Sequence, residues 1–296
     1  MIGQLPRRAV AIGLVAAAGT GGIALAQSPA SSGNFGGGAI AVPVDENSVA
    51  GDMLLSIRAL ASGKVGVDGQ LSTNCGHATI TGTATRAADG SFTLAGNATR
   101  KPVLGVRERT TFTVTGVLTA EGGTGSAKGS MRVTGPNRSA KTCTSKTVSW
   151  TVRRPGAVVA PAPAPAAATL FGLTAQRGAN GKRPVVLHTA NAGRSIDRFV
   201  LGFRATCERG RIVVVDDVNY SPEFDVAADG SFRSVERFRI NYSDVIQRTT
   251  IVVRGQFDVA GAVAGKLSVT QRYTSRKRGT RVDVCATGTL SWSARP

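Results

Sequence analysis

Hydrophobic and polar residues alternate with a period of two along much of this chain. In residues 199–207 the apolar positions recur at every second residue: Phe199, Leu201, Phe203, Ala205 and Cys207. In residues 111–116, Phe112 and Val114 alternate with threonines in the same way. Because successive side chains of a strand point to opposite faces, these patterns predict β-strands with one buried face. We expect about eight such strands in each half of the chain.

Two local patterns refine this prediction. Asp89-Gly90 and Asp229-Gly230 each separate two strand-like runs, and we interpret them as hairpin turns whose two central residues take positive φ. From Val49 to Ala61 the spacing of the apolar residues fits an amphipathic helix as well as a strand. We favour a strand there by analogy with the other half of the chain.

The two halves of the chain carry the same landmarks in the same order. They are Cys75, Ala88–Phe92, Gly116, Cys143 and Trp150 in the first half and Cys207, Ala228–Phe232, Gly255, Cys285 and Trp292 in the second. Corresponding landmarks lie 139 to 142 residues apart, except for the first cysteines, which are 132 apart. This order predicts an internal repeat, with extra residues near 209–223 that lengthen a hairpin of the second copy.

An uncharged segment divides the halves. Residues 155–168 read PGAVVAPAPAPAAA, and alternating prolines favour an extended chain over a helix or a sheet. We therefore predict an all-β fold of two tandem antiparallel β-sandwich modules, 50–154 and 170–296, joined by a semi-rigid Pro/Ala linker at 155–169. The Gly- and Ser-rich residues 27–49 are predicted to be flexible.

The first 26 residues read as an export signal. Arg7 and Arg8 precede the apolar run Ala9–Ile23, and Ala24–Ala26 provides small residues for cleavage. The paired arginines leave both the general secretory route and the twin-arginine route open. No second apolar run of about 18 residues follows, so we expect no transmembrane segment after cleavage. The prediction is a secreted protein, free in the medium or associated with the cell wall.

Export affects the four cysteines, because thiols outside the cytosol tend to form disulfides. The linker places Cys75 and Cys143 in one module and Cys207 and Cys285 in the other. Of the three possible pairings, we therefore predict Cys75 with Cys143 and Cys207 with Cys285.

The charge gives the clearest indication of a partner. The formal net charge is +18; residues 50–154 hold 14 basic and 5 acidic side chains and residues 170–296 hold 20 and 11, so each half carries +9. Such a field attracts polyanions, including cell-wall polymers and acidic polysaccharides. The densest basic set lies at a predicted hairpin tip: Arg272, Arg276, Lys277, Arg278 and Arg281. The alternative is a solvated turn whose charges discourage edge-to-edge aggregation. Tyr273 is the only aromatic residue there, so specific nucleic-acid recognition is not expected.

Motifs of the common enzyme classes are missing from the sequence. His77 and His188 fall in different halves without metal-ligand spacing, and we predict surface or strand-end positions for them, no metal site and no cofactor. A calcium loop at 225–229 would lack the usual ligand spacing. Asp216 and Asp217 are adjacent, so on a strand they point to opposite faces and cannot form the carboxylate pair of a glycosidase.

The two tryptophans allow two interpretations. Trp150 and Trp292 could be platforms for sugar rings, but their shared position after a cysteine favours matching core positions beside a disulfide.

These observations favour a non-catalytic exported binding or structural protein that associates with an anionic extracellular polymer. The alternatives are a secreted hydrolase with its site in loops such as 209–223, and an inert extracellular spacer. The sequence does not indicate an oligomeric state.

A resemblance supports the fold and the compartment. The second half contains Phe171-Gly172, Phe203–Cys207, Asp229–Phe232, Gly255–Phe257, Gly265–Leu267 and Cys285–Trp292. Over most of residues 170–296 it resembles a secreted β-sandwich repeat of actinobacterial exported proteins. The first module, 50–154, is similar more loosely, through Cys75, Asp89–Phe92 and Cys143–Trp150, and it lacks the Phe-Gly opening and a tight Gly-Gln-Phe equivalent. The resemblance implies no catalytic residues.

Overall fold

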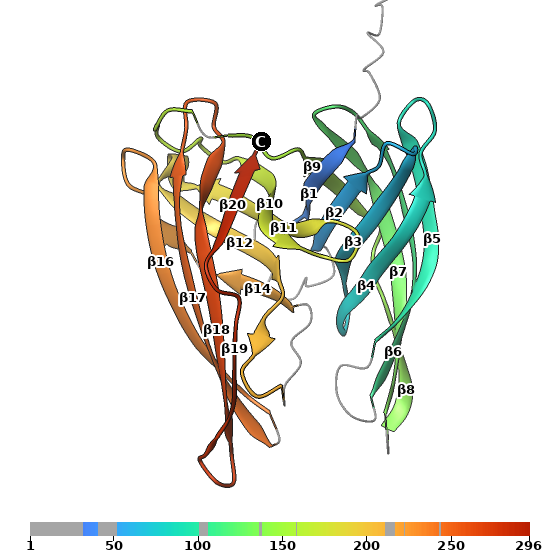
Figure 1. The fold of residues 1–296 in the computed structure, drawn as a ribbon, viewed down its shortest axis with the longest axis vertical. Helices are drawn as coiled ribbons and strands as arrows, with labels where there is room; N and C mark the ends of the chain where they lie inside the picture. Colours follow the sequence, from blue (N-terminus) through green and yellow to red (C-terminus); the bar gives the residue numbers. More distant parts are fainter. Residues whose placement is uncertain are drawn as a thin grey trace, which may run out of the picture.

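A computed structural model describes residues 32–40, 52–100, 106–135, 138–157, 159–210, 217–221, 223–242 and 244–296. These residues form an all-β fold of two antiparallel sheets that stand side by side (Figure 1). The all-β class is therefore confirmed, whereas the predicted export signal at 1–26 lies outside the described residues. Within the described part of the chain, no helix has the length and apolar character needed to cross a bilayer.

The first sheet is built from the first half of the chain. Its strands are β1 (Gly33–Ala39), β2 (Met53–Ala59), β3 (Lys64–Thr73), β4 (Gly76–Thr85), β5 (Ser91–Arg100), β6 (Arg107–Leu118), β7 (Gly122–Gly135), β8 (Arg138–Thr144) and β9 (Val148–Arg153). Their order is β4-β3-β2-β1-β9-β7-β6-β5, with β8 paired to the far part of β7. A bridge between Arg86 and Phe92 joins the two ends of this order, so the sheet curls around its own core.

The second sheet uses the rest of the chain. Its strands are β10 (Thr169–Arg177), β11 (Lys182–Ala190), β12 (Ser195–Phe203), β13 (Thr206–Cys207), β14 (Asp217–Ser221), β15 (Phe224–Asp225), β16 (Ser231–Asn241), β17 (Val245–Phe257), β18 (Val263–Ser275), β19 (Arg281–Ala286) and β20 (Leu290–Arg295). A 3-10 turn, η2 (Asn191–Gly193), joins β11 to β12. The pairing runs β16-β17-β18-β20-β10-β11-β12, β14 and β15 both pair with β12, and β19 pairs with the far part of β18.

Each sheet encloses a separate hydrophobic core. Trp150 lies in the first core and Trp292 in the second, and both side chains are almost fully buried. In the second core the ring of Trp292 meets Phe199 edge to face, with their centroids 5.3 Å apart. The prediction that both tryptophans are core residues is thus confirmed, and neither is available as a sugar platform; Cys285 belongs to the core of Trp292, whereas Cys143 packs in a cluster separate from that of Trp150.

The cysteines pair as predicted. Cys75, in the turn between β3 and β4, is bonded to Cys143, and Cys207 is bonded to Cys285, so each disulfide lies within one half of the chain. Cys143 lies on β8, which pairs with the C-terminal part of β7. Cys285 lies on β19, which pairs with the C-terminal part of β18.

The prediction for residues 49–61 is confirmed where the structure describes it. Residues 53–59 form strand β2, and Leu55 and Ile57 point into the first core. The apolar residue Leu54 points the other way, toward the second sheet. Buried apolar residues on both faces of one strand, with Leu54 opposite Leu55 and Ile57, explain why the sequence pattern did not distinguish a strand from a helix.

The two sheets pack against each other along a surface that we call the seam. It is formed by the outer face of β1–β3 against the outer face of β10–β12, and Figure 1 shows these strands facing each other at the centre of the molecule. Leu54 of the first sheet is buried there against Val186 and Val200 of the second. The Arg198 guanidinium contacts the Asp52 carboxylate across the seam at 2.5 Å, and both side chains are almost completely buried. Apolar contact and a buried ion pair together hold the halves in one arrangement.

Strand β1 corrects the prediction of flexibility for residues 33–39; residues 27–31 and 41–49 lie outside the described residues. Residues 33–39 pair with both β2 and β9, and Phe35 is fully buried in the first core. The glycines that suggested flexibility instead permit close packing. A Cβ atom on Gly36 would lie 2.1 Å from the Gly172 carbonyl oxygen of β10. The composition predicts a flexible segment because glycine in a strand has no side chain that reveals the alternation.

We expect the substitution Gly36→Ala to lower the free energy of unfolding by about 1 to 3 kcal/mol, because the added methyl group overpacks the seam. Urea unfolding monitored by tryptophan fluorescence measures the change. Gly156→Ala is the control, since a Cβ atom there meets nothing closer than 4.0 Å. Equal stabilities of the two variants would show that β1 does not approach β10 this closely.

The Pro/Ala segment is also different from the prediction of a spacer that separates two modules. Its backbone lies along the second sheet: Ala162 N–H donates to the Phe257 carbonyl at 3.1 Å, and Pro161 bridges to Asp258. Further along, the Thr189 hydroxyl donates to the Pro165 carbonyl at 2.6 Å. An extended chain without its own hydrogen bonds has free carbonyl groups, which the neighbouring strands and loops bind here.

Two smaller predictions need correction. The strand expected to run to Cys207 ends at Phe203, because the chain then crosses to pair Cys207 with Cys285 of β19.

The turns at Asp89 and Asp229 place only the glycine at positive φ, 87° at Gly90 and 80° at Gly230. In the first turn, Gly90 N–H donates to the Ala87 carbonyl, and Asp89 accepts from Ser91 N–H at 2.9 Å. The Ser91 hydroxyl, followed by its N–H, lowers the pKa of Asp89. A turn of this kind needs one left-handed residue rather than two.

Candidate anion-binding surface

The predicted basic hairpin tip is present between β18 and β19. Arg272, Arg276, Lys277, Arg278 and Arg281 are all exposed. The turn is closed by Ser275 N–H donating to the Thr280 carbonyl at 2.9 Å, and Gly279 takes a left-handed φ of 63°. The solvated-turn alternative explains part of this set, because Arg281 forms an exposed ion pair with Glu208, and Arg276 donates to the Tyr242 carbonyl.

Arg272 instead belongs to a larger surface on the outer side of β16, β17 and β18. Directly paired residues of neighbouring strands point to the same side of a sheet. Arg239 pairs with Arg248, and Arg248 pairs with Arg272. Three arginines, one on each strand, therefore form a line across the sheet, which we call the tip row.

A second line lies further along the same strands. Arg233 pairs with Arg254, and Arg254 pairs with Lys266; we call this line the distal row. The rows are separated by six residues along β17, from 248 to 254, which corresponds to about 20 Å of strand. Arg237 lies between them. All of these basic side chains are exposed.

We call the outward side of β16–β18 the basic face. Its outward positions are Ser231, Arg233, Val235, Arg237, Arg239 and Asn241 of β16, Ile246, Arg248, Thr250, Val252, Arg254 and Gln256 of β17, and Ala264, Lys266, Ser268, Thr270, Arg272 and Thr274 of β18. They include no acidic residue. None of the basic ones has an ion-pair partner among the residues that the structure describes. Like charges directly opposite each other destabilise a sheet, so this arrangement lowers stability unless an anion is bound.

The corresponding strands of the first sheet present a different surface. The outward positions of β5–β7 are mainly hydroxyl residues, including Thr93, Thr111, Thr113, Thr115, Thr124, Ser126 and Ser130. Some bond to each other across strands, as Thr111 and Ser130 do at 2.8 Å. Its exposed basic residues are Arg107, Arg109, Lys128 and Arg132, four against the seven of the basic face. A dense basic face is therefore a property of the second sheet and does not follow from the strand order that both sheets share.

Sequence reasoning found Arg272 and missed the remainder of the basic face. The available signal was the alternation of arginine with inward residues in β16, where the apolar Phe232 and Phe238 point inward and Arg233, Arg237 and Arg239 point outward. The rows themselves depend on strand register, which joins positions far apart in the sequence.

The carboxylates of the first half do not assemble a catalytic pair. Asp52 binds Arg198, Asp68 accepts from the Thr81 hydroxyl at 2.8 Å, and Glu121 binds Arg295. Burial raises the pKa of Glu108, and Arg100 opposes that shift. A single carboxyl group with a raised pKa lacks the second carboxylate that glycoside hydrolysis needs.

The structure describes most of the remaining residues considered for the hydrolase alternative. Asp216 is outside the described residues, and Asp217 begins β14. His188 is buried near the end of β11, where its Nδ1 is 2.7 Å from the Asp197 carboxylate, so it is a strand-end residue but not a surface one. His77 lies near the start of β4, 3.2 Å from the Ser72 hydroxyl. No three His, Cys, Asp or Glu side chains of the described ranges are grouped for a metal ion.

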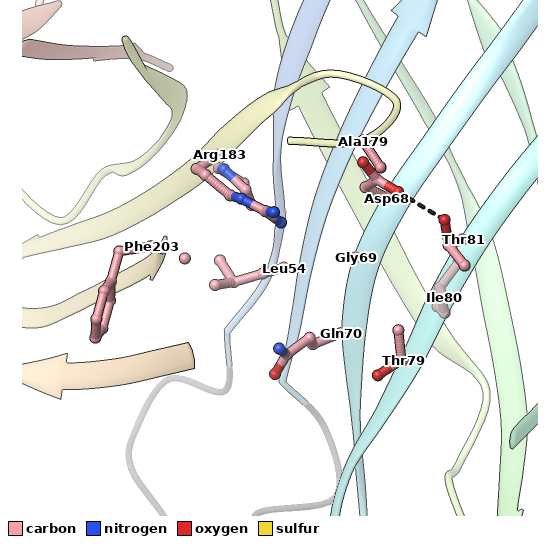
Figure 2. Close-up of a pocket in the computed structure, with 12 residues that line it drawn as sticks. Leu54, Asp68, Gly69, Gln70, Thr79, Ile80, Thr81, Ala179, Arg183 and Phe203 are labelled. Atoms are coloured by element: carbon pink, nitrogen blue, oxygen red, sulfur yellow. Dashed lines mark hydrogen bonds between the residues drawn. The ribbon is translucent and has the colours of Figure 1, made fainter. Parts of the chain in front are cut away.

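A cavity of about 260 Å³ opens at the seam (Figure 2). Leu54, Asp68 and Gln70 line it from the first sheet, and Arg183 and Phe203 line it from the second. Figure 2 shows Asp68 bonded to Thr81 on the neighbouring strand, away from Arg183. The lining contains no histidine, cysteine or serine, so it does not supply the nucleophile and base of a common hydrolase.

Comparisons with known proteins add no family. No family model matches the chain, and a search of curated proteins found no match. The resemblance to secreted actinobacterial repeats stays a prediction, and function has to be inferred from the surface itself.

Proposed function

We propose that this chain is a non-catalytic exported protein that binds an anionic extracellular polymer, such as a cell-wall polymer or an acidic polysaccharide, through the basic face. The observation that carries the proposal is the pair of three-residue basic rows on β16–β18 with no acidic side chain among the outward positions. Such a field raises the local concentration of polyanions and releases their counterions on contact.

The shape of the basic face favours a chain-like ligand. Its charges extend over about 20 Å of strand between the two rows, and residues 245–257 of β17 pair without interruption with residues 263–275 of β18. A linear polyanion can contact both rows at once. Because the two contacts are linked, its affinity is greater than the affinity that either row provides alone. A single small anion can contact only one row.

The outward residues also restrict the kind of polymer. No Phe, Tyr or Trp occupies an outward position of the basic face. Single-stranded nucleic acids are usually held by base stacking on aromatic side chains, which this surface lacks. The proposal therefore names charge-dense polymers without bases, and it expects no specific reading of a nucleic-acid sequence.

We further propose that the two sheets are copies of one duplicated β-sandwich module, related to secreted actinobacterial repeats, and that the protein acts outside the cytosol. The shared strand order supports the duplication, and the two disulfides support an oxidising compartment. The seam, rather than a free linker, sets the relative position of the copies in this proposal.

Binding to immobilised polyphosphate tests the proposed function, with the uncharged polymer matrix as the reference. We expect affinity to fall at least about tenfold between 50 and 200 mM salt, because each neutralised phosphate releases a counterion. Binding that does not depend on salt, or no binding at low salt, would contradict the proposal.

A further inference from the structure

A second, smaller concentration of positive charge lies at the seam. A pocket of about 180 Å³ is lined by Asn34 and Arg58 of the first sheet and by Arg177, Gly178, Gly181 and Lys182 of the second. Asn34 and Arg58 are paired residues on β1 and β2. Arg177 and Lys182 are paired residues on β10 and β11, on either side of the hairpin turn 178–181.

The turn is fixed in place by the first sheet. Asn180 N–H donates to the Asp68 carboxylate at 2.5 Å, and the Asn180 side-chain amide donates to the other Asp68 oxygen at 3.0 Å. A Cβ atom on Gly181 would lie 2.4 Å from the Ser56 hydroxyl oxygen. Because the turn is held so closely, Arg177 and Lys182 are kept beside Arg58 rather than free to move apart.

No negative charge compensates this pocket within the described residues. Arg58, Arg177 and Lys182 have no ion pair there. The two acidic residues of the seam are otherwise engaged: Asp68 holds Asn180 and Thr81, and Asp52 binds Arg198. Three like charges around one small pocket repel each other, and a bound anion would remove that repulsion.

We propose that this pocket is a binding site for a single phosphate or sulfate group, separate from the basic face. Guanidinium groups match the geometry of tetrahedral oxyanions, and a lysine adds a compact charge. The volume is below the range of roughly 300 to 1,000 Å³ typical of drug-sized ligands, so a small group fits and a bulky one does not. The group is a free ion or the phosphate of a larger molecule whose remaining part lies outside the pocket.

Because both sheets contribute, the bound group joins them. A ligand that binds only the packed arrangement stabilises it by mass action. The site therefore couples anion concentration to the strength of the seam, which the basic face alone does not do.

The test compares two triple variants of the full mature chain that remove the same charges. The pocket variant is Arg58→Gln with Arg177→Gln and Lys182→Gln, and the control is the distal-row variant Arg233→Gln with Arg254→Gln and Lys266→Gln. Thermal unfolding is followed in sodium chloride and with up to about 10 mM inorganic phosphate at matched ionic strength. We expect phosphate to raise Tm by about 3 °C or more in the parent and in the distal-row variant, and not in the pocket variant.

A second measurement distinguishes anion binding from a purely structural role of the pocket residues. In chloride, Lys182→Gln alone should leave Tm unchanged or raise it, because it removes repulsion, whereas in phosphate it should reduce the gain. Phosphorus NMR of phosphate titrated with the parent protein measures binding directly and needs no variant. Glycerol phosphate in parallel distinguishes the two sources: equal binding shows that the pocket accepts a substituent, and weaker binding shows that it takes the free ion.

Equal phosphate-induced shifts in the parent and the pocket variant would overturn this inference, as would no shift and no NMR binding in the parent. Loss of the shift in the distal-row variant alone would place the phosphate on the basic face and overturn it as well. Loss of polyphosphate binding in the distal-row variant with an intact phosphate shift concerns the proposed function and leaves the pocket supported, so the two failures are distinguishable.

Discussion

Replacing Arg198 by methionine will lower the free energy of unfolding by about 3 to 5 kcal/mol, because it removes the opposite charge that the buried Asp52 carboxylate contacts. The side chains of Arg198 and Asp52 are only 10% and 8% exposed. Urea unfolding of the parent and the variant measures the difference. Unfolding should lose cooperativity or shift to lower urea, since this contact connects the two sheets.

Two controls make the result specific to the buried pair. Arg281→Met breaks the exposed pair with Glu208, whose side chains are 52% and 56% exposed, and should cost about 1 kcal/mol or less. Combining Arg198→Met with Asp52→Leu should recover much of the loss, because an apolar pair often replaces a buried ion pair at little cost. If Arg198→Met costs no more than Arg281→Met, the seam is not packed as described.

Removing the disulfide Cys207–Cys285 by a double alanine substitution will reduce stability by about 4 kcal/mol, since the bond closes a long loop of the unfolded chain. The two residues are 78 positions apart in the sequence. Alanine is preferred to serine because Cys285 is fully buried and a hydroxyl group there would need a partner.

The bond Cys75–Cys143, with a separation of 68 residues, gives a matched comparison. The chain-entropy account expects nearly equal losses for the two double variants, and mass mapping of the oxidised parent should find only these two pairs. A variant as stable as the parent would show that its bond contributes nothing. A bridge between the halves would contradict the fold itself.

The fold could be predicted from the sequence where side chains alternate between core and solvent. Phe112 and Val114 point inward on β6 and the threonines beside them point outward, as their spacing indicated. Disulfide pairing also followed, because the Pro/Ala segment divided the cysteines correctly. For these strands, the alternation of apolar and polar residues and the burial of the apolar side are sufficient to predict the structure.

The seam could not be predicted because its strands bury apolar residues on both of their faces. Leu54, Val186 and Val200 are apolar and outward with respect to their own sheets, and a single sequence does not show that a second sheet covers them. Strand β1 could not be predicted for the opposite reason: its glycines have no side chains, so the sequence shows no alternation of apolar and polar residues. The partners of the Pro/Ala segment are distant in the sequence and could not be recognised there: Thr189 binds Pro165 from 24 positions away, and Phe257 binds Ala162 from 95 positions away.

The candidate site was predicted only in part, for a related reason. Clustering along the sequence revealed Arg272 and the hairpin tip, whereas Arg239 and Arg248 become neighbours of Arg272 only through strand register. The hairpin tip is less favourable for anion binding than its composition indicated, because Glu208 forms an ion pair with Arg281 and offsets its positive charge.

The central claim is that the basic face, and not net charge alone, binds the polymer. The most direct test is the salt dependence of polyphosphate binding in two triple glutamine variants with the same charge change. One removes the distal row, Arg233, Arg254 and Lys266; the other removes Arg109, Lys128 and Arg132 from the corresponding strands of the first sheet. We expect the slope of log affinity against log salt to become less steep by about 2 to 3 in the distal-row variant and to change little in the other. Equal changes in both would show that overall charge governs binding and would contradict the claim.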